Sequence, residues 1–301
     1  MLPRRIVPGQ VWFVTRRCFQ GRCLLRPDPE VSQIVSYVMA VAAKLSGVRI
    51  LAVIQMSNHW HLLVEDVEGR LPEFLQRAHW LITMAVNRFR HRYDSLFEAG
   101  ATHCQPVETL EDALRIASYI EANPVKDDLV DKAKEWPGLS SVLLEPEQVV
   151  SIPRPEIYFD EKGDMPDFAE LCLAPIPAFG TGYNGLQINK LVRARVRERE
   201  KVAREARRKA RRTVMGVKRV LATDPEDGPD ERPKPKPILW SCIPEVAKRI
   251  QEREDAFQDA YSEALPLWRR DKSVRMPYGT YWLRRFAGAL TEEPPPDAEA
   301  A

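Results

Sequence analysis

The sequence predicts an α+β protein: a ferredoxin-like, split βαβ domain with one added helix, followed by an α-helical extension. Two observations favour this class. Over roughly residues 1–136 the predicted order is strand, helix, strand, strand, helix, strand, and then a further helix. Beyond it, residues 137–185 are rich in proline, and residues 186–301 are mainly helical and basic, with an acidic, proline-rich tail after residue 290. We interpret these parts as a domain, a linker or extended wrapping segment, and an extension whose tail is disordered.

The first half of the small domain is predicted from local signals. The alternating stretch 11–17 indicates a strand. Asp28 and Pro29 are typical of a helix start, and apolar residues at three-and-four spacing continue that helix to about Gly47. The apolar, β-branched stretch 48–56 predicts a second strand, and Ser57-Asn58 supplies a two-residue turn into a third strand over 59–65.

The second half contains two more helices and a short strand. A helix over about 74–93 is followed by a strand near 102–107. Thr109 and Asp112 are spaced as in a capping box and begin the added helix, which Pro124 is expected to stop or kink. In the extension we expect helices over 186–220 and 244–270, separated by a polar, proline-rich stretch over 224–237.

Composition excludes several classes of protein. Hydrophobic residues make up 44% and charged residues 29% of the 301 residues, which argues against wholesale disorder. The longest apolar runs are far too short to span a membrane, and no apolar run follows the basic amino terminus, so we expect no membrane partner. The five cysteines form no CxxC pair, which favours reduced thiols in a cytoplasm.

The charge is unevenly distributed. The whole chain has a formal net charge of +2, but residues 190–219 contain 14 Lys/Arg and 3 Glu, a local net of +11. Such a segment indicates either contact with a polyanion or a solvated helix face, and we favour contact with phosphates. The arginines expected to contact nucleic acid are Arg193, Arg195, Arg197, Arg204, Arg207, Arg208, Arg211 and Arg212. Removing the chain beyond about residue 185 should therefore weaken DNA binding before it affects chemistry.

The candidate chemistry begins at Asn58-His59-Trp60-His61. On a strand His59 and His61 point to the same face, while Trp60 points to the opposite one. Two neutral imidazoles on one face can bind a divalent cation. The same pattern also fits two histidines that are merely exposed on a sheet. His79 and His91, in contrast, are expected to be ordinary surface residues of the second helix.

A tyrosine on the added helix completes the candidate site. Tyr119 lies off the buried stripe of that helix, and Asn123 follows four residues later on the same nominal face. A tyrosine phenol has a reference pKa near ~10 and is a poor nucleophile unless the electrophile is strongly activated. A bound cation provides that activation when it polarises a phosphate.

The two motifs together resemble a known family. Asn58–Glu65 reads N-H-W-H-L-L-V-E, and Y-I-E-A-N-P-V-K begins at Tyr119, 58 residues after the second histidine. This combination is similar to the single-tyrosine HUH transposases, especially their REP-associated branch, over roughly residues 1–136. The resemblance implies that His59 and His61 hold Mg²⁺ or Mn²⁺, with Asn123 in the position of a third ligand.

The resemblance also implies the reaction. Tyr119 would attack a phosphate of single-stranded DNA, leaving a 5′-phosphotyrosine and a free 3′-OH, and a second 3′-OH would rejoin the strands. The implied partner is single-stranded DNA with a hairpin beside the cleavage site, and the implied location is the nucleoid within the cytoplasm. Whether the protein forms a homodimer is left undecided by the sequence. The main alternative is a domesticated, non-catalytic DNA- or RNA-binding protein that retains the fold; another HUH endonuclease and a two-histidine metallohydrolase are further rivals.

Overall fold

The computed structural model describes residues 3–100, 102–229 and 241–295. The protein is a mixed α/β structure with a small antiparallel sheet and several helices. Its first half contains β1 (Gln10–Arg17), α1 (Pro29–Ser46), β2 (Val48–Gln55), β3 (His59–Asp66), α2 (Leu71–Arg90), β4 (His103–Val107) and α3 (Leu110–Lys126). Its second half contains β5 (Val149–Pro153), β6 (Phe168–Cys172), α4 (Gly185–Lys209), α5 (Val217–Ala222), α6 (Pro244–Arg270) and α7 (Trp282–Ala287).

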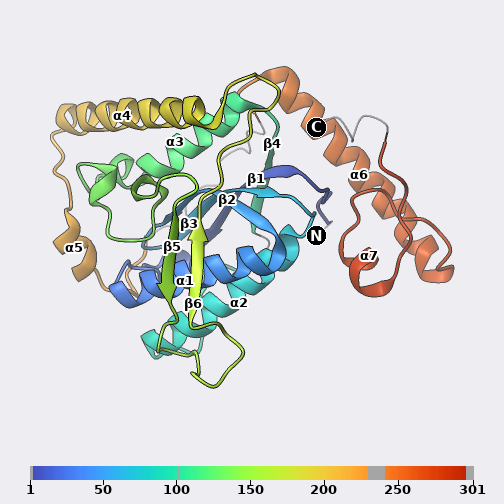
Figure 1. The fold of residues 1–301 in the computed structure, drawn as a ribbon, viewed down its shortest axis with the longest axis horizontal. Coiled ribbons are helices and arrows are strands. Elements are labelled where there is room, and N and C mark those ends of the chain that lie inside the picture. The colour runs from blue at the N-terminus through green and yellow to red at the C-terminus, as the bar shows by residue number, and fades with distance from the viewer. Residues whose placement is uncertain (1–2, 101, 230–240, 296–301) are drawn as a thin grey trace.

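The main sheet has four strands in the order β2-β3-β1-β4, and every neighbouring pair is antiparallel. The helices α1 and α2 cover one face of this sheet, and α3 covers the other (Figure 1). The strand β3 lies inside the sheet, between β2 and β1, so its backbone is held on both sides. The histidine motif is therefore carried by an inner strand.

The alternation along β3 separates two cores. Trp60, Leu62 and Val64 are fully buried against α1 and α2. Leu63 is also fully buried, but it belongs to the second core, between the sheet and α3. Because side chains two apart on a strand share a face, His59 and His61 lie on the α3 side with Leu63.

The helix α3 begins and ends for identifiable reasons. The Thr109 side chain accepts a hydrogen bond from the backbone N–H of Asp112, which caps the first turn. The helix continues two residues beyond Pro124 and ends at Lys126, rather than stopping at the proline. A proline this close to a helix end removes only one intrahelical hydrogen bond, and the Pro124 carbonyl accepts bonds from the loop that follows.

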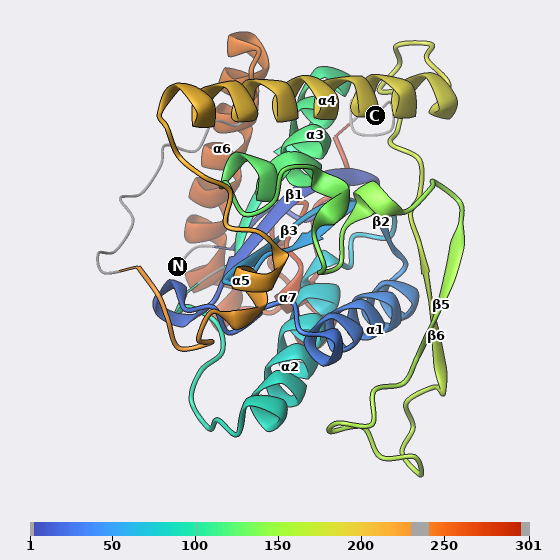
Figure 2. The same ribbon diagram turned by 90° about the vertical axis from the view of Figure 1, so that its left-hand side faces the viewer.

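The stretch 137–185 is more structured than a linker. The strands β5 and β6 form an antiparallel pair that packs against α1 (Figure 2). The pairing leaves Ala169 and Leu171 buried while their neighbours are exposed, and Phe159 packs edge-on against Tyr37 of α1. The prolines that obscured these two strands in the sequence lie at or beyond the strand ends.

The basic helix predicted over 186–220 is divided. The helix α4 ends at Lys209, and α5 is a separate short helix. Gly216 immediately precedes α5 at φ +81°, a backbone conformation that favours glycine. The apolar face of α4, formed by Ile188, Val192 and Val196, is buried in the same core as α3. The sequence pattern missed this break because Ala and Arg continue beyond the end of α4, over residues 210–212.

The C-terminal part places α6 and α7 beside the sheet edge at β4 (Figure 1). Arg249 and Arg253 of α6 pair with Glu108, just beyond β4. The predicted disordered tail is partly ordered, because the Glu292 N–H donates to the Met276 carbonyl. Residues 296–301 of that tail, and residues 230–237 of the predicted proline-rich stretch, lie outside the described residues. Among the residues that are described, no helix is long and apolar enough to cross a membrane.

Candidate active site

The two histidines of β3 lie side by side beneath α3. Their ring centroids are 4.6 Å apart. The His61 side chain is buried, with only 5% of the residue exposed, and His59 is half-buried. The two histidines are therefore not merely exposed side chains on a sheet surface, which was the simplest alternative to a binding site.

Each imidazole is fixed through its Nδ1 atom. The His61 Nδ1 lies 2.8 Å from the Thr15 hydroxyl on β1, directly across the sheet. The His59 Nδ1 lies 2.7 Å from the Asn58 side-chain oxygen. Because that oxygen accepts only, His59 donates from Nδ1 and keeps a free electron pair on Nε2. The Nε2 atom of His61 is buried and has no hydrogen-bond partner among the described residues.

Both imidazoles are held in the neutral form. Burial, together with the nearby Arg17 guanidinium, lowers the pKa of His59 to about 4. Burial also lowers the pKa of His61 well below its usual range, with His59 and Arg17 acting in the same direction. A neutral imidazole is the form that binds a metal ion.

Tyr119 packs directly against His61. Its ring centroid lies 5.3 Å from that of His61, with the planes at 62°. Phe13 of β1 contacts both residues: it stacks on His61 at 5.5 Å and meets Tyr119 edge-on at 6.3 Å. The Lys126 ammonium lies 5.5 Å from the Tyr119 ring centroid. The structure therefore brings the predicted tyrosine and histidines together, although they lie far apart in the chain.

Asn123 lies one helical turn after Tyr119 and is 1% exposed. Neither its Oδ1 nor its Nδ2 has a hydrogen-bond partner within the part of the chain that the structure describes. A buried amide without partners costs about 1–3 kcal/mol, so a missing ligand or water would be favourable here. Lys126 and Asp127 act electrostatically on His59, so the last turn of α3 adjoins the imidazoles.

The donor atoms fit a divalent cation. The site offers two imidazole nitrogens, whose Nδ1 atoms already have outer partners, and one amide oxygen that has none. The residues described include no cluster of three or more His, Cys, Asp or Glu that could hold a metal. A cation here would therefore keep coordination positions for water or a phosphate oxygen.

His103 of β4 lies nearby, with its ring 6.4 Å from that of Phe13. Two further residues, Phe13 and Thr15 of β1, were not identified from the sequence. The sequence shows only that these residues share a strand face. Their approach to His61 depends on how β1 pairs with β3. His79 was wrongly expected on the helix surface: its ring packs against Trp60 and Phe97, and burial lowers its pKa to about 3.

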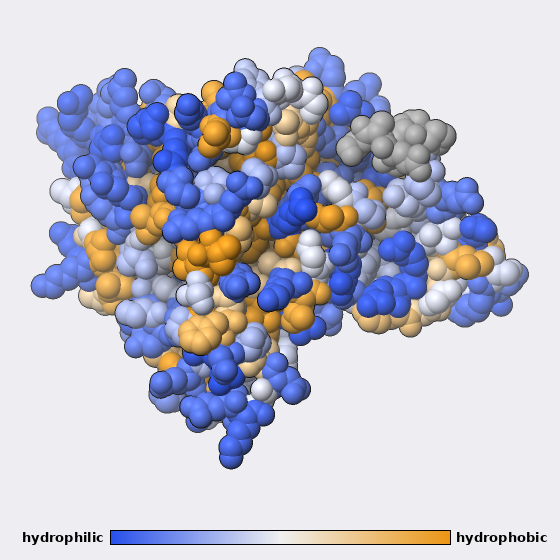
Figure 3. Space-filling view, in the orientation of Figure 1, coloured by the Kyte–Doolittle hydropathy of each residue, from blue (hydrophilic) through white to orange (hydrophobic). Residues whose placement is uncertain are grey.

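The arginines of α4 and the loop after it fall into two groups. The first group is engaged within the chain. Arg193 pairs with Glu145 and Arg195 with Glu111, and Arg204 contacts both Glu200 and the Asp131 carbonyl; Arg207 pairs with Asp128 and Asp131, and Arg212 also pairs with Asp128. The second group, Arg197, Arg208 and Arg211, is exposed and makes no ion pair with any described residue. The surface around α4 is strongly hydrophilic (Figure 3).

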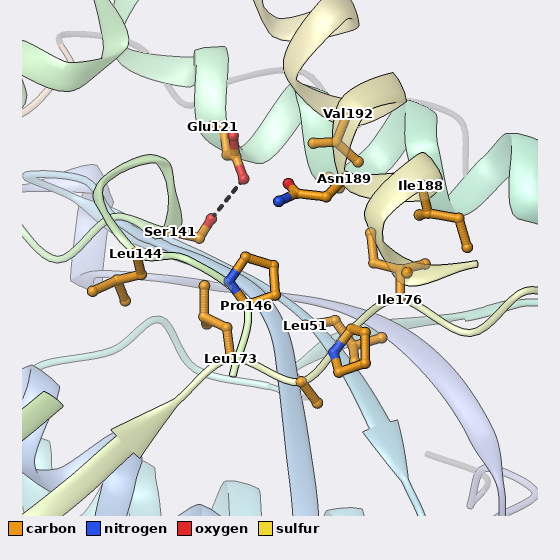
Figure 4. Close-up of a pocket in the computed structure, with 14 residues that line it drawn as sticks. Leu51, Glu121, Ser141, Leu144, Pro146, Leu173, Ile176, Ile188, Asn189 and Val192 are labelled. Carbon is orange, nitrogen blue, oxygen red and sulfur yellow. Dashed lines mark hydrogen bonds between the residues drawn. The ribbon is translucent and has the colours of Figure 1, made fainter. Parts of the chain in front are cut away.

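A second polar feature lies on another face of α3. Glu121 extends toward Ser141, whose hydroxyl lies 3.2 Å from its carboxylate, and Asn189 of α4 lies beside it (Figure 4). Burial raises the pKa of Glu121 to about 7. The adjoining cavity has a volume of about 30 Å³, enough for about one water molecule. Glu121 therefore serves the contact between α3 and α4 rather than the histidine site.

Two solved structures are similar to part of this chain. One is a REP-associated tyrosine transposase bound to a REP hairpin, with 17% identity, a TM-score of 0.40, and coverage of 47% of this chain and 81% of that one. The other is a putative transposase from Deinococcus radiodurans, with 17% identity, a TM-score of 0.30, and coverage of 40% and 94%. No family model matches the sequence, and no curated protein matches it.

Proposed function

We propose that this chain is a metal-dependent strand transferase for single-stranded DNA, of the single-tyrosine HUH transposase type, with Tyr119 as its nucleophile. One observation carries the proposal: Tyr119 packs on His61, which lies against a second neutral histidine, His59, and whose buried Nε2 has no hydrogen-bond partner among the described residues. The ferredoxin-like assignment belongs to the same proposal. The antiparallel strand order β2-β3-β1-β4 supports it.

The residues present would hold a cation through His59, His61 and Asn123. When bound, Mg²⁺ or Mn²⁺ would polarise the non-bridging oxygens of the scissile phosphate and stabilise the leaving oxygen. Thr15 and Asn58 orient the two imidazoles, and Phe13 packs against His61 and Tyr119. These contacts support a site that is ordered before substrate arrives.

The reaction balances without an external energy source. The Tyr119 oxygen forms a bond to phosphorus, the bond from phosphorus to the 3′ oxygen breaks, and that oxygen takes up a proton to become a 3′-OH. The phenolic proton passes to solvent. In the second step a 3′-OH attacks the 5′-phosphotyrosine and restores the phenol. Tyr119 and His61 meet within one chain, which supports cleavage by a single protomer.

The proposed partner is single-stranded DNA with a hairpin beside the cleaved site. Arg197, Arg208 and Arg211 are the arginines best placed for phosphate contact, because each is exposed and makes no ion pair with a described residue. The arginines that are already paired would have to exchange a carboxylate for a phosphate. The structure therefore favours three of the eight arginines that the charge pattern predicted for contact with nucleic acid.

Covalent capture tests the proposal. The full chain is incubated with Mn²⁺ or Mg²⁺ and a pool of random-sequence, hairpin-bearing oligonucleotides labelled at the 3′ end, and is then separated on a denaturing gel. The label should migrate with the protein, and peptide mass spectrometry should locate it on Tyr119. Tyr119→Phe should abolish capture but retain binding, whereas Tyr93→Phe, which alters a fully exposed tyrosine, should leave capture unchanged.

Two controls separate this proposal from its rivals. A chelator should prevent capture, and His61→Ala should do the same. Binding of DNA without any covalent adduct, under every metal condition, would favour the non-catalytic alternative. Hydrolysis that persists in Tyr119→Phe would favour a two-histidine metallohydrolase instead.

A further inference from the structure

A groove runs between α3 and α4 on the side of Tyr119. Its volume is about 570 Å³, within the range of small-molecule sites. One wall is formed by Ser118, Tyr119 and Ala122 of α3. The opposite wall comes from the second half of α4, outside the part of the chain that carries the two motifs. The candidate nucleophile therefore lines a space that the extension helps to build.

The floor of this groove is lined by small apolar side chains. Ala122 contributes from α3, and Val202, Ala203 and Ala206 contribute from α4. Val202 is 56% exposed, which is high for a valine beside a cavity. These small side chains line the groove with hydrocarbon that is partly open to solvent. Such a surface fits the face of a planar, apolar group.

The rim of the groove is cationic. Lys126, Arg195, Arg199 and Arg212 line it, against the single acid Glu198. Three of these cations are paired with carboxylates: Lys126 with Asp127, Arg195 with Glu111, and Arg212 with Asp128. Cations therefore outnumber acids among the side chains that line the rim, although only Arg199 has no carboxylate partner among the described residues.

Arg199 is the exception among these cations. Its guanidinium donates to the Ser118 hydroxyl at 2.9 Å and to the Arg115 carbonyl at 3.2 Å, both neutral acceptors, and it forms no ion pair with a described carboxylate. Burial lowers its pKa, and the neighbouring Arg115 and Arg195 act in the same direction. A half-buried, uncompensated cation next to Tyr119 favours an anion at this position.

We propose that this groove binds one nucleobase of single-stranded DNA, beside the phosphate that Tyr119 attacks. The inference rests on the proposed function and deepens it. The base would lie on Val202, Ala203 and Ala206, and a flanking phosphate would lie near Arg199. The charge pattern favours this occupant: an apolar floor with a cationic rim matches a base attached to its phosphates.

The test compares two exposed alanines of α4. Ala206 lines the groove, whereas Ala194 is exposed on the same helix but does not line it. Ala206→Leu fills the floor without adding an aromatic ring, and Ala194→Leu is its matched control. Both variants preserve helix propensity. Each full-length protein is titrated, with chelator present so that no cleavage occurs, against oligothymidylate and against an abasic oligomer of equal length.

We expect only the groove variant, Ala206→Leu, to lose the preference for an oligomer that carries bases over one that does not. Stacking of a base on an aromatic side chain is worth ~1–3 kcal/mol, and we expect contact with this aliphatic floor to lie at the lower end of that range, which corresponds to about fivefold in affinity. Ala206→Leu should reduce the preference for oligothymidylate over the abasic oligomer by about that factor, with abasic affinity unchanged. Ala194→Leu should retain the full preference. Equal preference in Ala206→Leu and in the unmodified chain would overturn the inference.

A second measurement locates the base directly. Oligothymidylate carrying one 5-iododeoxyuridine is crosslinked to the full chain by light, and the modified peptide is identified. An adduct within 118–126 or 195–212 supports the groove, and adducts confined to other segments overturn it. Capture of DNA on Tyr119 tests the proposed function separately: if capture fails while Ala206→Leu still removes base preference, the groove stands and the transferase proposal does not.

Discussion

Replacing Thr15 tests whether the outer contact of His61 matters for metal binding. The Thr15 hydroxyl lies 2.8 Å from the His61 Nδ1 and is the partner that leaves Nε2 free. Thr15→Val keeps the shape of the side chain but removes the hydroxyl. The ring then loses its orientation and its buried Nδ1 loses its partner.

The size of the effect follows from this one hydrogen bond. Loss of an outer partner of a metal-binding histidine costs 10–100-fold in metal affinity, or about 1.4–2.7 kcal/mol. A buried, unsatisfied Nδ1 would also destabilise the fold by about 1–3 kcal/mol. We therefore expect Thr15→Val to weaken Mn²⁺ binding by 10–100-fold and to lower the free energy of unfolding modestly.

Calorimetric titration with Mn²⁺ measures the first effect, and urea denaturation in chelator measures the second. Thr15→Ser retains a hydroxyl on Cβ and should restore metal affinity to within a few-fold of the unmodified chain. The two readouts separate positioning from simple destabilisation. The reasoning would be refuted if Thr15→Val bound Mn²⁺ as tightly as the unmodified chain, or if Thr15→Ser were as weak as Thr15→Val.

Three further predictions concern charge and stability. Arg207 is buried beside Asp128 and Asp131, so Arg207→Met, which leaves Asp128 paired with Arg212 alone and removes the Asp131 partner, should lower the free energy of unfolding by about 1–3 kcal/mol in denaturant titrations; an unchanged free energy would contradict this. His79 has a folded pKa of about 3 and an unfolded pKa near ~6.5, so between these values the unfolded chain binds the extra proton and stability falls as pH decreases. From pH 7 to pH 5 the protonation of His79 should lower the free energy of unfolding by about 2 kcal/mol. His79→Phe should remove this part of the pH dependence in denaturant titrations, and an unchanged dependence of the unfolding free energy on pH would count against it. Replacing the three unpaired arginines with alanine should reduce the salt dependence of oligothymidylate binding, by ~0.7 log per log of salt for each lost contact, and an unaltered slope would exclude these phosphate contacts. These three are Arg197, Arg208 and Arg211.

The sequence predicted the elements of the first half well because their signals are local. Helix caps, such as Thr109, and alternation, as along His59–Leu63, depend only on neighbours in the chain. The shared face of the two histidines follows from that alternation alone. Their approach to Tyr119 was a hypothesis, because it depends on which face of the sheet α3 covers.

The rest depends on long-range pairing. Thr15 and Phe13 enter the site only through the register of β1 against β3. The burial of His79 depends on Phe97, which approaches from a loop after α2. The partners of the α4 arginines lie up to 84 residues away in the chain, so charge counting treated paired and unpaired arginines alike. The metal ion, the DNA partner and the roles of the site residues stay predictions.

The way α4 is attached changes how this protein can be divided for experiments. Ile188, Val192 and Val196 fill the same core as α3, and Arg207 is held by carboxylates that follow that helix. Deletion after about residue 185 would expose the apolar face of α3 that α4 covers. A shortened chain would therefore lose solubility and rigidity together with DNA affinity. Inactivity of such a fragment would say nothing about catalysis. Point changes on the outer surface of α4 are the sounder way to separate recognition of the strand from its cleavage.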